Sequence, residues 1–298
     1  MQHLRRMGKH IVIGGNGPVG RQIVRLLAAD GEESVVVSRS SGLRFDASDA
    51  DALTRASAGA STIHLCAMPR YDRWPQEFQQ LMESTVVAAE RVGARIVSIG
   101  NTYLYGEGAP SPLTEDLPHR PTTVKGRVRA EMWERALAST APAIEVRGSD
   151  YLGHGAVSLF TLMVQPAVLE GRVARVPMDL DAEHPWTFVS DVARTAVAAA
   201  RINGPTKQVF HVPSTQASLR TVASRLATLT GAGVPKLERM PLEELVALGE
   251  HDSIIREVVE VAYLLDRAFT LDASKAERVL GVHATPLDEV LRDAFSAR

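Results

Sequence analysis

The feature that most constrains this chain is a short stretch near its N-terminus where an apolar run leads into regularly spaced glycines. Residues 11–13 are β-branched and apolar, as in a strand buried on both faces. Glycines follow at positions 14, 17 and 20, and a segment of helical periodicity comes next. A strand, a tight turn and a helix N-terminus in this order suit a dinucleotide, because backbone N–H groups and the helix dipole face its diphosphate. The residues expected to hold the diphosphate are Gly14, Asn16, Gly17, Pro18, Val19 and Gly20.

Two other interpretations fit part of the same stretch. Residues 15–20 also match the start of the phosphate-binding loop of nucleotide triphosphatases, but Arg21 and Gln22 stand where that loop requires Lys and then Ser or Thr. That class of enzyme is therefore excluded. The second alternative is that the glycines only form a compact turn. Their position between a strand pattern and a helix pattern favours the dinucleotide site.

The end of the second expected strand, residues 34–37, indicates which dinucleotide binds. NAD-binding proteins place a carboxylate there for the ribose 2′-hydroxyl, but this sequence continues with Ser38, Arg39 and Ser40. Arg39 offers a fork of donors to a 2′-phosphate, so we predict NADP over NAD; the alternative is that Arg39 is a solvated surface residue. Asp46 is expected beside the adenine, unless it or Ser48 caps the helix 49–57. Other expected cofactor contacts are Ser40, Cys66, Ala67 and Met68.

Strand and helix patterns alternate through the first half of the chain. Strands are expected at 11–13, 34–37, 61–67, 95–99 and 143–147, separated by helical patterns, which requires right-handed crossovers and a parallel sheet. We therefore predict an α/β fold, a doubly wound parallel sheet of the Rossmann type over residues 8–150. Residues 185–203 should return to it through a helix capped by Ser190 or Asp191. Residues 151–184 and 204–298 are expected to form a smaller α+β substrate-binding lid.

The composition excludes several classes of partner. Lys plus Arg number 33 against 35 for Asp plus Glu, a net charge of −2, so no basic field drives binding to nucleic acid or a membrane surface. No apolar run is long enough for a transmembrane helix or a secretory signal. The single cysteine, Cys66, excludes an internal disulfide and a cysteine-based zinc cluster, and no metal is predicted. We expect a cytoplasmic monomer or homodimer with a small-molecule substrate.

Several motifs together resemble a known superfamily. The glycine turn, the strand end at residues 65–67 and the Leu104-Tyr105-Gly106 segment are similar to those of the short-chain dehydrogenases/reductases. The chain most resembles the extended or atypical branch, the relatives of the NAD-dependent epimerases/dehydratases. Segments 147–153, 186–193 and 271–281 look like later landmarks of that branch, so the resemblance covers essentially the whole chain. It implies a Rossmann fold and chemistry that depends on NAD(P).

The catalytic residues of that superfamily are not all present. Standard members place Ser or Thr four residues before the Tyr of the Tyr-Gly pair, whereas Asn101 stands four residues before Tyr105, with Thr102 beside it. They also use Tyr-x-x-x-Lys on the following helix, where Tyr moves the proton, and Lys lowers the tyrosine pKa and binds the ribose. The second motif has no match in this sequence.

Two alignments of that helix are possible. An alignment on Gly126 and Glu131 puts Lys125 in the tyrosine position and Arg129 in the lysine position. A register shifted by four residues puts Pro121 and Lys125 there instead. Neither register supplies a tyrosine, so the usual acid–base group is missing.

The two cations suggest a substitute. Lys125 and Arg129 are four residues apart on one helix face, where mutual repulsion and partial burial would lower the lysine pKa. We predict that Lys125 protonates a carbonyl oxygen after hydride transfer from NADPH, and that Asn101 or Thr102 orients this oxygen. The alternative is that both cations bind cofactor ribose and phosphate, or an acidic substrate. The residues expected to line the substrate pocket are Tyr71, Trp74, Tyr103, Tyr151 and His154.

The prediction for the whole chain is an atypical NADP-dependent oxidoreductase that acts on a small carbonyl compound. One alternative is a sugar-nucleotide epimerase or dehydratase. Another is a non-catalytic NADP-binding regulatory protein, which the missing tyrosine favours. The substrate itself does not follow from the sequence, because one fold supports many chemistries.

Overall fold

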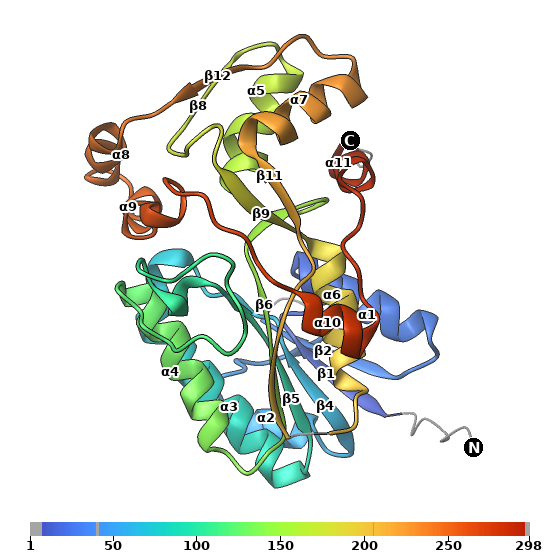
Figure 1. Ribbon diagram of the computed structural model, residues 1–298. Helices are drawn as coiled ribbons and strands as arrows, with labels where there is room; N and C mark the ends of the chain where they lie inside the picture. Colours follow the sequence, from blue (N-terminus) through green and yellow to red (C-terminus); the bar gives the residue numbers. More distant parts are fainter. Residues whose placement is uncertain (1–7, 40–41, 205, 296–298) are drawn as a thin grey trace.

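The centre of the molecule is a parallel β-sheet (Figure 1). The computed structural model describes residues 8–39, 42–204 and 206–295, and among these residues seven strands form the sheet in the order β10-β6-β5-β4-β1-β2-β3. Each neighbouring pair is parallel. The order reverses between β1 and β4, so the predicted doubly wound α/β sheet is confirmed. The strands are β1 Lys9–Ile13, β2 Ser34–Ser38, β3 Leu43–Arg44, β4 Ala60–Leu65, β5 Arg95–Asn101, β6 Ala143–Gly148 and β10 Lys207–His211.

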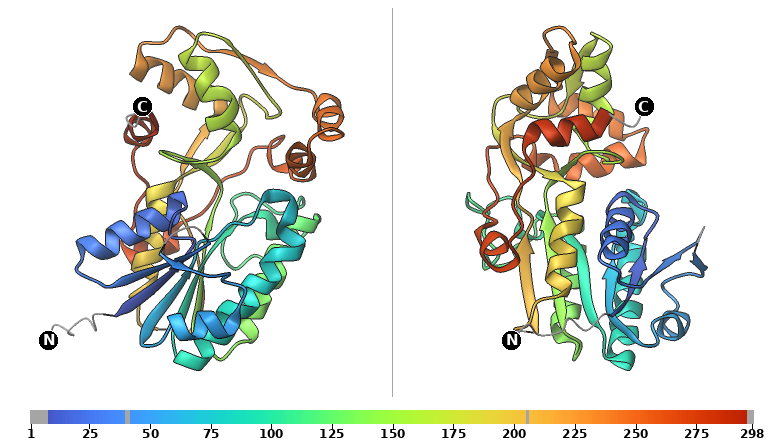
Figure 2. Two further views of the ribbon diagram at one scale, coloured as in Figure 1. Left: turned by 180° about the vertical axis from the view of Figure 1, so that it is seen from behind. Right: turned by 90° about the vertical axis from the view of Figure 1, so that its right-hand side faces the viewer.

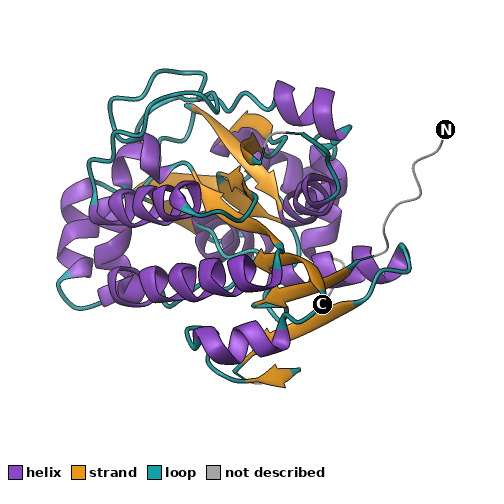
Figure 3. Ribbon diagram, turned by 90° about the horizontal axis from the view of Figure 1, so that it is seen from below, coloured by secondary structure: helices purple, strands orange, loops and turns teal. Residues whose placement is uncertain are grey.

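Helices cover both faces of this sheet (Figure 2, Figure 3). Ile11 and Ile13 pack with α2, α3 and α4, whereas Val12 packs on the other face with α1 and α6. An uninterrupted apolar strand is thus buried on both sides, as its sequence predicts. Among the described residues, no helix is both long and apolar enough to cross a membrane. The helices of this layer are α1 Pro18–Ala29, α2 Ala50–Ala56, α3 Trp74–Val92, α4 Val124–Ala138, α6 Val189–Ala200 and α10 Ser274–Leu280, with short turns η1 Tyr71–Arg73 and η2 Tyr103–Tyr105.

A smaller α+β unit stands beyond the carboxyl ends of the sheet strands (Figure 1). It starts where β7 follows β6, and β7 joins a three-stranded sheet of order β11-β9-β7. Residues 207–211, which the sequence places in this unit, instead form β10 at the edge of the large sheet. The strands of the unit are β7 Asp150–Leu152, β8 Val173–Val176, β9 Glu183–Phe188, β11 Thr215–Ser218 and β12 Lys236–Arg239. Its helices are η3 Phe160–Val164, α5 Gln165–Leu169, α7 Leu219–Thr230, α8 Leu242–Gly249, α9 Ser253–Glu260, η4 Ala262–Leu264 and α11 Leu287–Phe295.

Two predicted helix caps are wrong. Helix α2 is capped by Asp49, whose carboxylate accepts the N–H groups of Asp51 and Ala52, while the Asp46 carboxylate accepts the N–H of Ser48, which precedes the helix. Helix α6 starts earlier than expected, with Phe188 as its N-cap, and no side chain caps it. The buried carboxylate of Asp191 instead accepts hydrogen bonds from Thr285, so this residue ties the segment before α11 to the sheet layer.

Two buried histidines link β1 to β4. Nδ1 of His10 lies 3.1 Å from Nε2 of His64, and Nε2 of His10 lies 2.8 Å from the Glu32 carboxylate. Because the carboxylate can only accept, His10 carries its proton on Nε2, and His64 must donate from its own Nε2. Nδ1 of His64 has no partner among the described residues. Burial lowers the pKa of His64 to about 3.

Replacing His64 by Gln should flatten the dependence of stability on pH. The folded pKa of about 3 lies below the ordinary 6.5, so the unfolded chain binds more protons and the free energy of unfolding falls as the pH drops from 6.5 towards 3. At about 1.4 kcal/mol per pH unit, protonation of His64 lowers the free energy of unfolding by about 2–3 kcal/mol between pH 6.5 and pH 4.5. His64→Gln keeps a donor for His10 and abolishes the titration.

Denaturant unfolding at both pH values measures this difference. The exposed His251→Gln variant is the control and should lose as much stability as the unmodified chain. An equal loss in His64→Gln and His251→Gln would contradict the prediction.

Candidate functional site

The glycine turn fits a dinucleotide diphosphate. Gly14 has a φ of +78°, and a Cβ there would lie 2.6 Å from the backbone of Ala67. A Cβ on Gly20 would overlap the carbonyl oxygen of Gly14. Gly17 is the N-cap of α1 and supplies no side-chain cap, and Pro18 follows it. The first-turn amides of Val19 and Gly20 are therefore available to an anion at the positive end of the helix.

Several of the predicted cofactor residues lie at strand ends beside this turn. The side-chain amide of Asn16 donates to Ser38 Oγ at 2.8 Å, so the turn is tied to the end of β2, where Arg39 is exposed. The N–H of Cys66 donates to Ile13, and Met68 is 54% exposed just beyond β4. Burial raises the pKa of the Cys66 thiol to about 12, which disfavours the reactive thiolate form. Ser40, also predicted at the cofactor, lies outside the described residues.

Lys125 lies fully buried on the first turn of α4, which Thr123 caps. Its ammonium group forms ion pairs with Glu257 and, at 3.2 Å, with Glu260 of α9. The same ammonium lies 4.5 Å from the centre of the Tyr71 ring. Burial lowers the pKa of Lys125, and the charge of Glu260 opposes this shift. The direction agrees with the prediction, but its main cause is desolvation by burial.

Arg129 extends in a different direction from Lys125. Its guanidinium carbon lies 4.5 Å from the centre of the Trp74 ring and 4.2 Å from that of Phe78, and NH1 donates to the carbonyl of Ile99. NH2 lies 3.4 Å from the sulfur of Met68, beside the end of β4. Within the described ranges, Nε of Arg129 has no partner and no carboxylate pairs with this buried cation. An uncompensated buried cation at the strand ends suits an anionic or hydroxyl-bearing ligand.

Three of the predicted pocket residues form one aromatic cluster. The hydroxyls of Tyr71 and Tyr103 lie 3.0 Å apart, and the Trp74 ring stacks on Tyr103 and meets Tyr71 edge to face. Asn101 Oδ1 accepts the N–H of Tyr103 and so shapes the turn that starts at the buried Thr102. These polar groups stand at the carboxyl end of β5, where the sequence predicts them.

The other two predicted pocket residues lie apart from this cluster. Tyr151 on β7 is half-buried, and burial raises its pKa to about 12. His154 is exposed in the next loop, where its N–H donates to Asp293. A Cβ added at the adjoining Gly155 would lie 3.5 Å from the Pro18 side chain, so this loop stands beside the start of α1.

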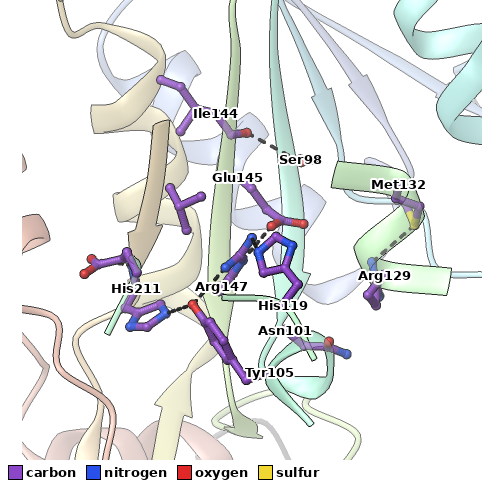
Figure 4. A network of polar contacts seen from close by, with 12 residues as sticks. Ser98, Asn101, Tyr105, His119, Arg129, Met132, Ile144, Glu145, Arg147 and His211 are labelled. Atoms are coloured by element: carbon purple, nitrogen blue, oxygen red, sulfur yellow. Dashed lines mark hydrogen bonds and ion pairs between the residues drawn. The ribbon is translucent and has the colours of Figure 1, made fainter. Parts of the chain in front are cut away.

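A second polar network crosses the ends of β6 and β10 (Figure 4). Arg147 donates to Glu145 at 2.6 Å and to the Tyr105 hydroxyl at 2.8 Å. Nδ1 of His211 donates to the carbonyl of Asp272, so its Nε2 accepts the Tyr105 proton at 2.6 Å. Burial raises the pKa of Tyr105 to about 12. Its hydroxyl is committed within this network and is not a donor for a ligand.

The sequence analysis missed two groups of residues. The first is the pair Asp150 and His184, whose side chains lie 2.6 Å apart beyond the end of β6. Asp150 could have been found, because it closely follows a strand of the parallel sheet. The second is Glu257 with Glu260, which reach Lys125 from α9 and leave no local signal in the sequence.

Similar proteins are found among the known families and the solved structures. The model of the NAD dependent epimerase/dehydratase family matches residues 10–212. No curated protein matches the sequence. Among solved structures, MoeE5 in complex with UDP-glucose and NAD is 24% identical with a TM-score of 0.77, covering 97% of this chain and 98% of that one. UDP-glucuronic acid 4-epimerase from Bacillus cereus, with UDP-glucuronic acid and NAD, is 17% identical with a TM-score of 0.76 and the same coverage. Bordetella bronchiseptica WbmH with NAD⁺ is 18% identical with a TM-score of 0.74, again covering 97% and 98%.

These structures share the fold, and each of them holds NAD. The preference for NADP over NAD inferred from Arg39 stays a prediction for this chain. The family match runs from β1 to the end of β10 and spans more than half of the chain. The resemblance seen in the sequence is thereby confirmed: the chain belongs to the NAD dependent epimerase/dehydratase family.

Proposed function

We propose that this protein binds a nicotinamide dinucleotide and reversibly oxidises a hydroxyl-bearing carbon of a sugar nucleotide, as an epimerase or dehydratase. The observation that carries the proposal is the uncapped, glycine-lined start of α1 at the same sheet edge as Lys125 and Arg129. Family membership supports the cofactor. The UDP-sugars bound to two neighbours support the substrate class. Reduction of a small carbonyl compound, the main prediction from the sequence, has less support.

Different residues of the chain would bind the cofactor, bind the substrate and assist the reaction. The cofactor would supply reversible hydride transfer, and the amides of Val19 and Gly20 would hold its diphosphate. Arg129 would bind ribose or an anionic group of the substrate. Lys125, in the place of the missing tyrosine, would set a positive charge beside the substrate oxygen as its proton leaves. The large sheet with its helices would bind the cofactor, and the smaller unit would bind the substrate.

Turnover with defined compounds tests this function. The protein is mixed with NAD and either UDP-glucose or UDP-glucuronic acid, and both reduction of NAD and formation of a new sugar nucleotide are measured. A panel of small carbonyl compounds with NADH and NADPH tests the other prediction. Binding of NAD without hydride transfer to or from any compound would identify a non-catalytic dinucleotide-binding protein.

Lys125→Met should lower turnover by about 100-fold or more while NAD affinity changes less than threefold, because a charge that stabilises the transition state is lost. The exposed Lys236→Met is the matched control and should retain full turnover. Since the variant also leaves Glu257 and Glu260 unpaired, a triple variant that adds Glu257→Gln and Glu260→Gln separates the two effects. Recovery of turnover in the triple variant would show that Lys125 only holds α9 in place.

The role of Arg39 is tested separately. Arg39→Ser should weaken NADP binding by about tenfold or more and change NAD binding less than twofold, because a hydrogen bond to a charged group contributes about 1.5–3 kcal/mol. Calorimetric titration with both dinucleotides measures this difference, with the exposed Arg55→Ser as control. An equal change for NAD and NADP would mean that Arg39 does not contact the 2′-phosphate.

A further inference from the structure

Asp150 and His184 form a hydrogen-bonded pair at the carboxyl end of β6. Oδ2 of Asp150 lies 2.6 Å from Nε2 of His184. The Asp150 side chain is 32% exposed and that of His184 only 2%. A ligand can therefore reach the carboxylate, and the imidazole supports it from the protein interior.

The surroundings of His184 indicate which ring nitrogen donates a hydrogen bond. Its ring centre lies 5.0 Å from those of Trp186 and of Phe269, and in the described part of the chain its Nδ1 has no hydrogen-bond partner. A proton on Nδ1 would be a buried donor without an acceptor, which is costly. Nε2 of His184 therefore donates its proton in a hydrogen bond to Asp150, which leaves the other carboxylate lone pairs free.

The nearby tyrosines can donate a proton but cannot accept one. Burial raises the pKa of Tyr71 and of Tyr103, and the negative charge of Asp150 raises both further. Both hydroxyls thus keep their protons at neutral pH. The two hydroxyls share one hydrogen bond, so one O–H remains to donate to a ligand oxygen.

Lys125 does not supply an acceptor either. Its ammonium group already forms ion pairs with the carboxylates of Glu257 and Glu260. Unlike the two tyrosines and Lys125, Asp150 carries a proton acceptor that a ligand can reach. Its orientation is fixed by the hydrogen bond from the buried His184. A general base requires this combination of reach and orientation.

We propose that Asp150 accepts the proton of a substrate hydroxyl and that His184 is its positioning residue. The inference rests on the proposed function. In the oxidation, the O–H bond would break and its proton would move to Asp150, while the hydride of the same carbon would go to the bound dinucleotide as the C=O bond forms. In the reverse direction, the carbon would regain the hydride from the reduced dinucleotide, and the oxygen would regain the proton from Asp150.

Asp150→Asn tests the acceptor, because the amide is isosteric and cannot take a proton. With NAD and UDP-glucose as probes, the expected result is a loss in kcat of about 100-fold or more with KM within threefold. Calorimetry should show unchanged binding of both probes. Asp150→Glu should restore part of the kcat, and the exposed Asp181→Asn, which lies in a surface ion pair, should behave as the unmodified chain.

His184→Phe tests the positioning residue. The phenyl ring fills the space between Trp186 and Phe269 but cannot donate a hydrogen bond to Asp150. We therefore expect kcat to fall about tenfold, with KM and probe binding unchanged. Thermal unfolding confirms that each variant is folded.

The outcomes separate this inference from the proposed function. Turnover of Asp150→Asn at the original rate, or a rise in KM with kcat unchanged, overturns the role of Asp150 and leaves the function standing. Absence of hydride transfer in the unmodified protein, with NAD bound, overturns both.

Discussion

Gly20→Ala is expected to lower the affinity for NAD by about 100-fold, close to 2.7 kcal/mol. The added Cβ would overlap the Gly14 carbonyl oxygen and approach the Cα of Gly15, so α1 must move away from the glycine turn. Binding depends on amides at fixed positions around the diphosphate, and a shifted helix no longer presents them. Helix propensity alone favours alanine by about 1 kcal/mol, so any loss of affinity arises from this close approach.

Calorimetric titration measures the affinity for NAD, and thermal unfolding measures what the displacement of α1 costs in stability. Gly108→Ala is the matched control, because a Cβ there meets nothing within 4 Å and its backbone is not left-handed. Gly108→Ala should bind NAD as tightly as the unmodified chain. Retained affinity in Gly20→Ala would show that the dinucleotide does not bind at this turn.

The sheet could be predicted from the sequence because its signals are local. Residues 11–13 are apolar throughout, glycines punctuate the next turn, and the strand observed as β1 covers the same positions. The helix that ends at Gly93 was likewise predictable, since Gly93 adopts the left-handed conformation that stops a helix. The N-cap of α2 could not be predicted from the sequence, because Asp46, Ser48 and Asp49 are all good caps by residue type. Only the backbone geometry selects Asp49.

The site could be predicted only in part because its partners are distant in sequence. Asn101 and Tyr103 follow a strand, so their place at the sheet edge follows from the fold. Lys125 was singled out by its position, but Glu257 and Glu260 lie more than 130 residues further on, and polar pairs leave no periodic pattern. The pairing of Asp150 with His184 similarly depends on β9, which brings the imidazole alongside β7.

Arg147→Met is expected to destabilise the protein by about 3–5 kcal/mol, the cost of leaving one member of a buried ion pair without its partner. Arg147 is fully buried, and besides Glu145 it donates to the Tyr105 hydroxyl and to His119. Glu145 is only 4% exposed, so its charge would lose its counter-ion in a site that water barely reaches. The midpoint of thermal unfolding should fall by about 10 °C. Arg172→Met, which breaks an exposed pair with Glu170, should change stability by less than about 0.5 kcal/mol.

A double variant identifies the source of that cost. If the unpaired charge of Glu145 is responsible, Glu145→Leu together with Arg147→Met should recover most of the lost stability, because the buried carboxylate is then gone as well. If the stability is not recovered, the cost lies in the bonds from Arg147 to Tyr105 and His119. The Tyr105 hydroxyl is hydrogen-bonded to His211, and His211 is hydrogen-bonded to the Asp272 carbonyl. Failure to recover the stability would therefore mean that this network holds the C-terminal segment against the sheet. A loss no larger than that of Arg172→Met would contradict both explanations.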